Sequence, residues 1–185
     1  MAIWQFNIYL IPKQSLLNRF DEIPEQLYID HEGWSDHLRN GDLDDKPVFE
    51  DALSIFWWVD IQIPFNPILF LEFGNIQDWT KDAVDCKNYG NPDTNDLYVS
   101  FDEKENYIQE IGCRIDLRNI DKRFVGSLFS LAVKFDCMLM DRKGRLFQPS
   151  FADLFRSVEL SNPNRFVNDP GQFLDDLSKG IVEPE

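Results

Sequence analysis

The sequence YIQEIGCRIDL at residues 107–117, with DKRFVGSLFSLAVKF at residues 121–135 after it, decides the fold. Side chains alternate across a strand, so the first stretch has one apolar face and one mostly polar face. The apolar face carries Ile111, Cys113, Ile115 and Leu117 with Tyr107 and Gln109, and the other face carries Ile108, Glu110, Gly112, Arg114, Asp116 and Arg118. In the second stretch the apolar residues follow the helical period: Phe124, Val125, Leu128, Leu131, Ala132 and Phe135. We therefore expect a strand with a helix lying on its apolar face.

Further stretches with alternating or short apolar runs predict the rest of a sheet. Residues 4–12 and 55–63 read as strands, although the start of the second also fits a helix that begins near Val48. Residues 97–101 form an antiparallel hairpin with the central strand in this interpretation. A second hairpin joins residues 137–140 to 145–148 through a turn in which Gly144 can adopt a positive φ. Turn chemistry without periodicity marks residues 79–93 as connecting structure.

Helix signals lie between and after these strands. Short helices are expected at residues 15–20 and 68–73, the second begun by Asn66 and Pro67 and ended by Gly74, although a strand fits there too. One helical turn is expected near residues 34–39. Two C-terminal helices are predicted by a capping box at Ser150 and Asp153, with an apolar stripe after it, and by Asp169 and Pro170 before the inward-facing Phe173, Leu174 and Leu177, with Gly180 as the stop.

Together these elements predict a single α+β domain over residues 1–180, with residues 181–185 as a C-terminal tail. Antiparallel hairpins with helices grouped after them indicate a mainly antiparallel sheet of about five or six strands with helices packed on one face. A hydrophobic content of 43% in 185 residues is enough for one substantial core.

The charge of the chain limits its partners. Lys and Arg number 18 against 33 Asp and Glu, which gives a formal net charge of −15. Such a field repels phosphate backbones and anionic lipids, so we expect neither nucleic-acid nor membrane binding. A basic protein would instead be attracted, with an association rate that falls as salt rises.

The cysteines and the N-terminal sequence indicate a compartment. Cys86, Cys113 and Cys137 are odd in number and lack the spacing of a zinc or redox motif. The first residues lack the basic and long apolar regions of a signal peptide. We therefore expect a cytoplasmic protein with free thiols and no cofactor or metal.

Residues 21–51 hold more than half of the negative charge. Eleven acids face two bases there, a local charge of −9, and the apolar residues are sparse. This acidic segment is predicted to bind a basic partner, with Trp58 as a semi-exposed aromatic anchor beside it; the carboxylates proposed for contact are Asp36, Asp42, Asp44, Asp45, Glu50 and Asp51. A solvated loop that only keeps the protein soluble is the alternative.

The second half of the chain carries a family resemblance. It rests on Ile115-Asp116-Leu117-Arg118, the helix after it, the hairpin around Gly144, the run SNPNRFVNDP at residues 161–170 and Phe173-Leu174, with Trp57-Trp58 and Trp79 more loosely. In these positions the chain resembles small acidic immunity-type proteins of bacterial polymorphic toxin systems. The resemblance implies a cytoplasmic bacterial protein that neutralises a toxin or effector domain, and it carries over no catalytic residue.

Two other clusters and two other classes of function stay open. His31 and His37 lie among carboxylates, which suits a metal-assisted hydrolase, although their spacing separates them on a helix. Arg114, Asp116 and Arg118 form either an anion site or a salt-bridge ladder. No nucleophile, phosphate-loop or metalloprotease motif is present, which favours a non-catalytic role over an enzyme. A structural or assembly subunit is the third class, and the oligomeric state is left open.

Overall fold

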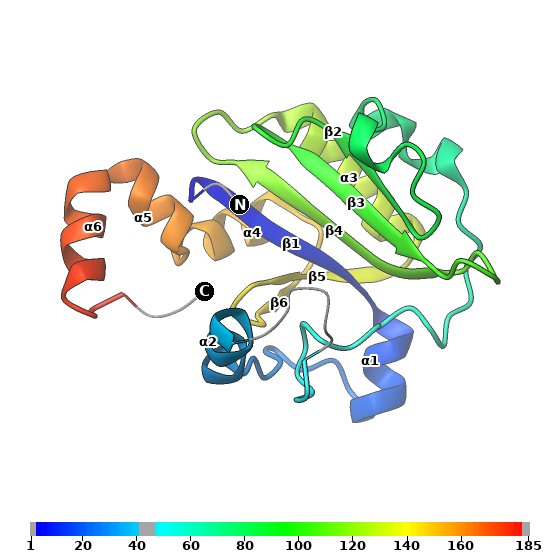
Figure 1. Cartoon of the computed structure of the whole chain (residues 1–185), viewed down its shortest axis with the longest axis horizontal. Coiled ribbons are helices and arrows are strands. Elements are labelled where there is room, and N and C mark those ends of the chain that lie inside the picture. Colours follow the sequence, from blue (N-terminus) through cyan, green and yellow to red (C-terminus); the bar gives the residue numbers. More distant parts are fainter. Residues whose placement is uncertain (1–2, 41–46, 183–185) are drawn as a thin grey trace.

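The structure, a computed structural model, describes residues 3–40 and 47–182 (Figure 1). Its centre is one antiparallel sheet of six strands in the order β2-β3-β4-β1-β5-β6. The strands are β1 (Gln5–Pro12), β2 (Cys86–Gly90), β3 (Asp96–Phe101), β4 (Ile108–Asp116), β5 (Cys137–Asp141) and β6 (Leu146–Phe147). The predicted single α+β domain with an antiparallel sheet is confirmed.

The α-helices are α1 (Lys13–Phe20), α2 (His31–Asn40), α3 (Lys122–Lys134), α4 (Phe151–Glu159), α5 (Asn162–Asn168) and α6 (Pro170–Ser178). The longest helix, α3, lies behind the sheet in the view of Figure 1, and α6 lies away from the sheet. Two 3-10 helices, η1 (Pro67–Phe73) and η2 (Asp78–Thr80), precede β2. The Asn66 side chain accepts a hydrogen bond from the Ile68 N–H and Gly74 ends η1, as predicted for a short helix there.

The core lies between α3 and the sheet. The Asp121 carboxylate caps α3 by accepting hydrogen bonds from the backbone N–H groups of Arg123 and Phe124. Val125, Leu128 and Ala132 on the inner face of the helix are fully buried, and so are the core-facing residues Ile8, Leu97, Ile111 and Leu139 of the sheet. The predicted pairing of strand and helix is therefore confirmed.

Strict alternation along β4 misplaces one residue. Ile108 was expected on the polar face, yet it is fully buried in the core. The register of β3 against β4 shifts between Ser100 and Phe101, so that Phe101 pairs with Ile108. A bulge of this kind inserts one residue and turns the next side chain to the other face. The polar face is also less exposed than expected, because Gly112 and Asp116 on it are buried.

Residues 55–63 are not a strand, which corrects the prediction. The chain there forms successive turns, with Val59 N–H bonded to the Phe56 carbonyl and Ile61 N–H to the Trp58 carbonyl. The indole N–H of Trp58 donates to the Leu10 carbonyl of β1, and Trp57 and Trp58 are both buried. Trp57 and Trp58 are adjacent in the sequence and both buried, so the alternation at these residues does not reflect the two faces of a strand.

Two other differences concern the edges of the molecule. β2 lies within the stretch expected to be only connecting structure, because its single buried aromatic, Tyr89, gives no alternating pattern. Residues 75–77 hydrogen-bond to residues 88–90, which covers this edge strand. In α6 Phe173 is buried as predicted, but Leu174 and Leu177 are half-exposed, because α6 packs on α5 away from the sheet (Figure 1).

Candidate functional site

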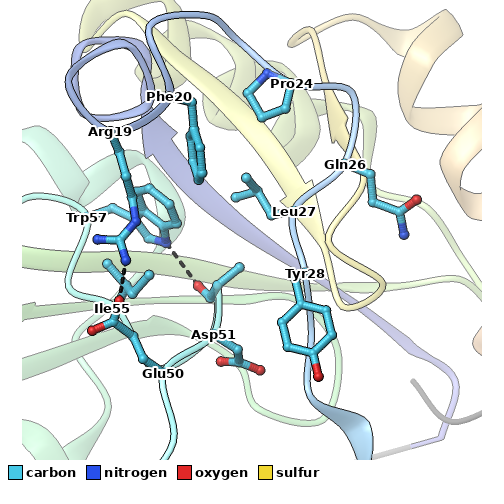
Figure 2. A pocket seen from close by; sticks show the side chains of 11 residues that line it. Arg19, Phe20, Pro24, Gln26, Leu27, Tyr28, Glu50, Asp51, Ile55 and Trp57 are labelled. Carbon is cyan, nitrogen blue, oxygen red and sulfur yellow. Dashed lines mark hydrogen bonds and ion pairs between the residues drawn. The ribbon is translucent and has the colours of Figure 1, made fainter.

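A groove with a volume of about 390 Å³ opens beside the acidic segment (Figure 2). Three stretches of chain form it: the end of α1, residues 24–28 and residues 50–57. Clefts of a few hundred Å³ lined mainly by apolar and aromatic side chains are the usual form of binding pockets. We therefore define the groove by its lining residues, Arg19, Phe20, Pro24, Gln26, Leu27, Tyr28, Glu50, Asp51, Ala52, Ile55 and Trp57.

The floor of the groove is apolar and fixed in place. Leu27, Ala52 and Trp57 are buried, and the indole N–H of Trp57 donates to the Ala52 carbonyl at 2.9 Å. Phe20 lies with its ring centroid 6.4 Å from that of Trp57 and keeps part of its face open to solvent. The floor thus offers aromatic and aliphatic surface that is held by contacts within the chain.

The wall at residues 24–28 is held by the turn between β5 and β6. Leu27 N–H donates to the Gly144 carbonyl at 2.8 Å. Gly144 has φ +78°, and a Cβ on it would lie 2.2 Å from the Leu27 carbonyl oxygen. The positive φ predicted at Gly144 is confirmed, and the close approach is a second reason for glycine there.

The rim carries charge and one exposed aromatic ring. The Arg19 guanidinium forms an ion pair with the Glu50 carboxylate, and these side chains are 45% and 67% exposed. Tyr28 is 71% exposed and adjoins the same groove (Figure 2). The rim therefore presents groups that a partner can reach directly.

Asp51, one of the predicted contact residues, has a structural role. Its carboxylate accepts four hydrogen bonds, from the N–H groups of Asp30, Leu53 and Ser54 and from the Trp34 indole, at 2.7–2.9 Å. Asp51 is buried, so its side chain does not offer the partner contact expected from the sequence. Its hydrogen bonds instead connect the start of α2 and Trp34 to the turn at residues 51–54, next to the groove floor.

The other predicted contact residues separate into three groups. Glu50 is on the groove rim, and Asp36 is exposed on α2 with its carboxylate 3.6 Å from the Arg39 guanidinium. Asp42, Asp44 and Asp45 lie outside the described residues. Trp58 is only 1% exposed, so its assignment as a surface anchor is wrong. Its indole N–H donates a hydrogen bond to the Leu10 carbonyl inside the fold.

Sequence reasoning missed Phe20 and Tyr28. Both are aromatic and close to the acids of residues 21–51, which was an available signal, but Trp58 appeared the stronger candidate. Four other carboxylates of the described acidic segment are exposed and form none of the ion pairs found in residues 3–40 and 47–182: Asp21, Glu22, Glu25 and Glu32. Two of them, Asp21 and Glu22, follow Phe20 directly in the chain.

A second groove, of about 470 Å³, lies between α4 and the β5–β6 hairpin. Its charged lining residues are balanced, with Arg145 and Arg156 beside Glu25 and Asp153. The guanidinium of Arg145 already forms a salt bridge with the buried carboxylate of Asp141. The first groove is therefore the better match to the acidic segment.

The two histidines both belong to α2, and they do not converge. The ring of His37 packs edge-to-face against Trp34, with centroids 5.8 Å apart. Within the described ranges no group of three or more His, Cys, Asp or Glu side chains is placed to hold a metal ion.

The arginines on the polar face of β4 form salt bridges. Arg114 pairs with Asp96 of β3, and Arg118 pairs with Asp116 at 2.7 Å and covers the ring of Trp4 at 4.3 Å. Hydrogen bonding by Arg118 lowers the pKa of the Asp116 carboxyl, and hydrogen bonding to Asp96 raises the pKa of Arg114. Both arginines are thus paired with carboxylates of the chain: the Arg114–Asp96 pair joins two strands, as in the ladder considered from the sequence, whereas Asp116 and Arg118 are two residues apart in one segment.

A cluster of titratable groups lies next to this ladder. The Tyr98 hydroxyl donates to the Glu110 carboxylate, and Tyr9 lies on the same face of the neighbouring strand β1. Burial raises the pKa of Tyr9 to about 12, and burial also raises the pKa values of Tyr98 and Glu110. The hydrogen bond between Tyr98 and Glu110 joins β3 to β4, and the cavity beside Tyr9 and Glu110 has a volume of only about 10 Å³.

Comparison with known proteins yields no relative. No protein family, no curated protein and no solved structure matches this chain. In the part of the chain that the structure describes, no helix has the length and apolar character needed to cross a membrane.

Proposed function

We propose that this chain is a non-catalytic binding protein of the immunity type, which holds a basic toxin or effector domain through the acidic segment and the groove beside it. The observation that carries the proposal is the combination found there: an apolar groove formed in part by the acidic segment, with the exposed ring of Tyr28 on its rim and the partly exposed ring of Phe20 beside Trp57. Interfaces bind most strongly where aromatic anchors fill pockets inside a polar rim.

Electrostatics support a basic partner. The described part of residues 21–51 contains eight acids and one base, and Asp21, Glu22, Glu25 and Glu32 among those acids are exposed. With a net charge of −15 on the whole chain, a cationic surface is steered toward this side and an anionic one is repelled. Binding of this kind weakens as salt screens the charges.

In this proposal Tyr28 and Phe20 are the aromatic anchors of the interface, the role that the sequence analysis assigned to Trp58. Tyr28 lies on the groove rim with most of its surface exposed, and Phe20, beside Trp57 on the floor, is partly exposed. Large aromatic side chains contribute much contact area at small entropic cost, which is why they are enriched among the residues that dominate binding. The geometry therefore favours a protein partner over a catalytic role for this site.

The test is binding to the product of the neighbouring gene, measured calorimetrically at low and at high salt. We expect a complex that weakens steeply with salt. Replacing three exposed acids of the segment (Asp21→Asn, Glu22→Gln, Glu25→Gln) should weaken it further. The matched control removes the same charge elsewhere (Asp82→Asn, Glu103→Gln, Glu105→Gln), and it should leave most of the affinity. Equal losses in the two variants, or a complex that ignores salt, would contradict the proposal.

A further inference from the structure

We propose that the groove receives one arginine side chain of the basic partner, in the place that Arg19 of the chain itself now holds against Glu50. This inference deepens the proposed function and rests on it. It assigns Glu50 as the residue that recognises the guanidinium and Arg19 as an internal occupant that the partner displaces.

The first observation is the position of the Arg19–Glu50 pair. Arg19 belongs to the last turn of α1 and Glu50 to the opposite wall, so the pair spans the rim of the groove (Figure 2). A carboxylate on this rim is therefore already bound by a guanidinium. An incoming arginine would form with Glu50 the same guanidinium–carboxylate ion pair that Arg19 forms now.

The second observation is how loosely that internal pair is held. Both side chains keep about half or more of their surface in water. Ion pairs as exposed as this contribute little to stability, because solvent screens the charges and long side chains lose conformational freedom. Exchange of Arg19 for another guanidinium therefore costs the fold little.

The groove also suits the remainder of an arginine side chain. Arginine has an apolar stem, which can lie along Phe20, Leu27 and Trp57, and a planar head that can bind the Glu50 carboxylate on the rim. The volume of about 390 Å³ leaves room for flanking residues of the partner. An aliphatic ligand would contact the floor alone and would leave the Arg19–Glu50 pair in place.

Charge selects a cation. With Arg19 displaced, the ionisable lining residues are Glu50 and Asp51 together with the exposed Tyr28. Asp51 is bonded by three backbone N–H groups and one indole, all of them neutral donors, so its charge is not cancelled by an ion pair in the described residues. Arginine fits this rim better than lysine, because its planar fork can bind a carboxylate through two N–H groups at once.

The test uses the full ¹⁵N-labelled chain and three peptides, acetyl-Gly-Phe-Arg-Gly-amide and its lysine and citrulline counterparts, followed by NMR at the Trp57 indole N–H. We expect the arginine peptide to shift that signal, the lysine peptide to bind more weakly and the neutral citrulline peptide to give no saturable shift. A citrulline peptide that binds as well as arginine would overturn the inference.

Two variants separate this site from general electrostatics. Arg19→Met removes the internal occupant and should tighten the arginine peptide about two- to fivefold, the range that a freed exposed ion pair allows. Arg39→Met removes the same charge from the Asp36 pair on α2 and should change the affinity by less than that range. Glu50→Gln should abolish the discrimination between arginine and citrulline. Equal effects of Arg19→Met and Arg39→Met would overturn the inference.

The inference and the proposed function fail in different ways. A salt-sensitive complex with the basic partner that is unchanged by Glu50→Gln and Arg19→Met would refute the arginine site and keep the proposed function. Specific binding of the arginine peptide by a chain that forms no complex with a basic partner would support the site and refute the proposed function. Exposure of both side chains makes these variants compatible with folding, which circular dichroism verifies.

Discussion

Tyr98 of β3 lies across Gly112 of β4 so closely that a Cβ on Gly112 would stand 2.4 Å from Cε1 of the tyrosine ring. The ring cannot move aside freely, because its hydroxyl is hydrogen-bonded to the Glu110 carboxylate on the same strand as Gly112. Glycine in a strand interior often marks a place where another group approaches the backbone closely. Here the group is a tyrosine that closes the polar face of the sheet.

Gly112→Ala should therefore destabilise the protein. Overpacking of a well-filled site costs about 1–3 kcal/mol, and we expect the free energy of unfolding in urea to fall by this amount. Gly126→Ala on α3 is the matched control, since nothing lies within 4 Å of its added methyl group. Alanine there should raise stability by up to about 1 kcal/mol through helix propensity. Equal effects at the two positions would contradict the close packing of Tyr98 on Gly112.

Leu128→Ala tests the packing of α3 on the sheet. Leu128 is fully buried between the helix and the strands, so its truncation should lower the free energy of unfolding by about 2–5 kcal/mol. Val133→Ala, on the same helix but 66% exposed, should change it by no more than about 0.5 kcal/mol. Chemical denaturation of both variants provides the comparison, and a small loss at Leu128 would refute this arrangement of helix and sheet.

Glu110 should make stability depend on pH in an unusual direction. Burial raises the pKa of the Glu110 carboxyl in the folded state, while the hydrogen bond from Tyr98 opposes part of the rise. The stability that this group contributes is therefore fully present below its unfolded pKa, about 4.3, and is lost as the pH rises through the folded pKa. The opposite sign applies to Asp116, whose lowered pKa contributes stability that is lost in acid.

Glu110→Gln removes this titration and keeps an oxygen that can accept the Tyr98 hydrogen bond. The free energy of unfolding of the variant should rise relative to the natural chain as the pH increases from about 4 to 7. Glu103→Gln, at an exposed position of the β3–β4 turn, should show no such trend. Urea unfolding across this pH range measures both, and a difference that is constant or falls with pH would contradict the raised pKa of Glu110.

The local periodicity of the sequence predicted the elements that it controls by itself. The strand around Ile111 and Ile115 and the helix around Leu128 were recognised because one apolar face meets another, and their burial follows directly. Capping signals placed the starts of α4 at Ser150 and α6 at Asp169 for the same local reason, since a side-chain oxygen satisfies free N–H groups at the helix start.

The remaining features depend on partners that are distant in the sequence. Alternation at residues 55–63 is typical of a strand. In the structure the Trp58 indole N–H donates to the Leu10 carbonyl, 48 residues away, and the segment forms turns instead of pairing as a strand. β2 exists because β3 pairs with it, although its own sequence offers only Tyr89 to the core. The groove joins residues from α1, residues 24–28 and residues 50–57, so no single stretch could disclose it.

Tyr28→Ala should separate stability from binding at the proposed partner surface. Because 71% of its surface is exposed, removal of the ring should change the free energy of unfolding by no more than about 0.5 kcal/mol. Affinity for the neighbouring gene product should nevertheless fall by about 2 kcal/mol, the loss typical of an aromatic anchor that fills an interface pocket. Tyr28→Phe keeps the ring and should retain most of the affinity if ring contact is what matters.

Trp79→Ala is the control, because that ring is 69% exposed but belongs to η2 and not to the groove. Calorimetric titration of the three variants decides the point: similar losses for Tyr28→Ala and Trp79→Ala would show that exposed aromatic surface in general, and not this groove, attracts the partner.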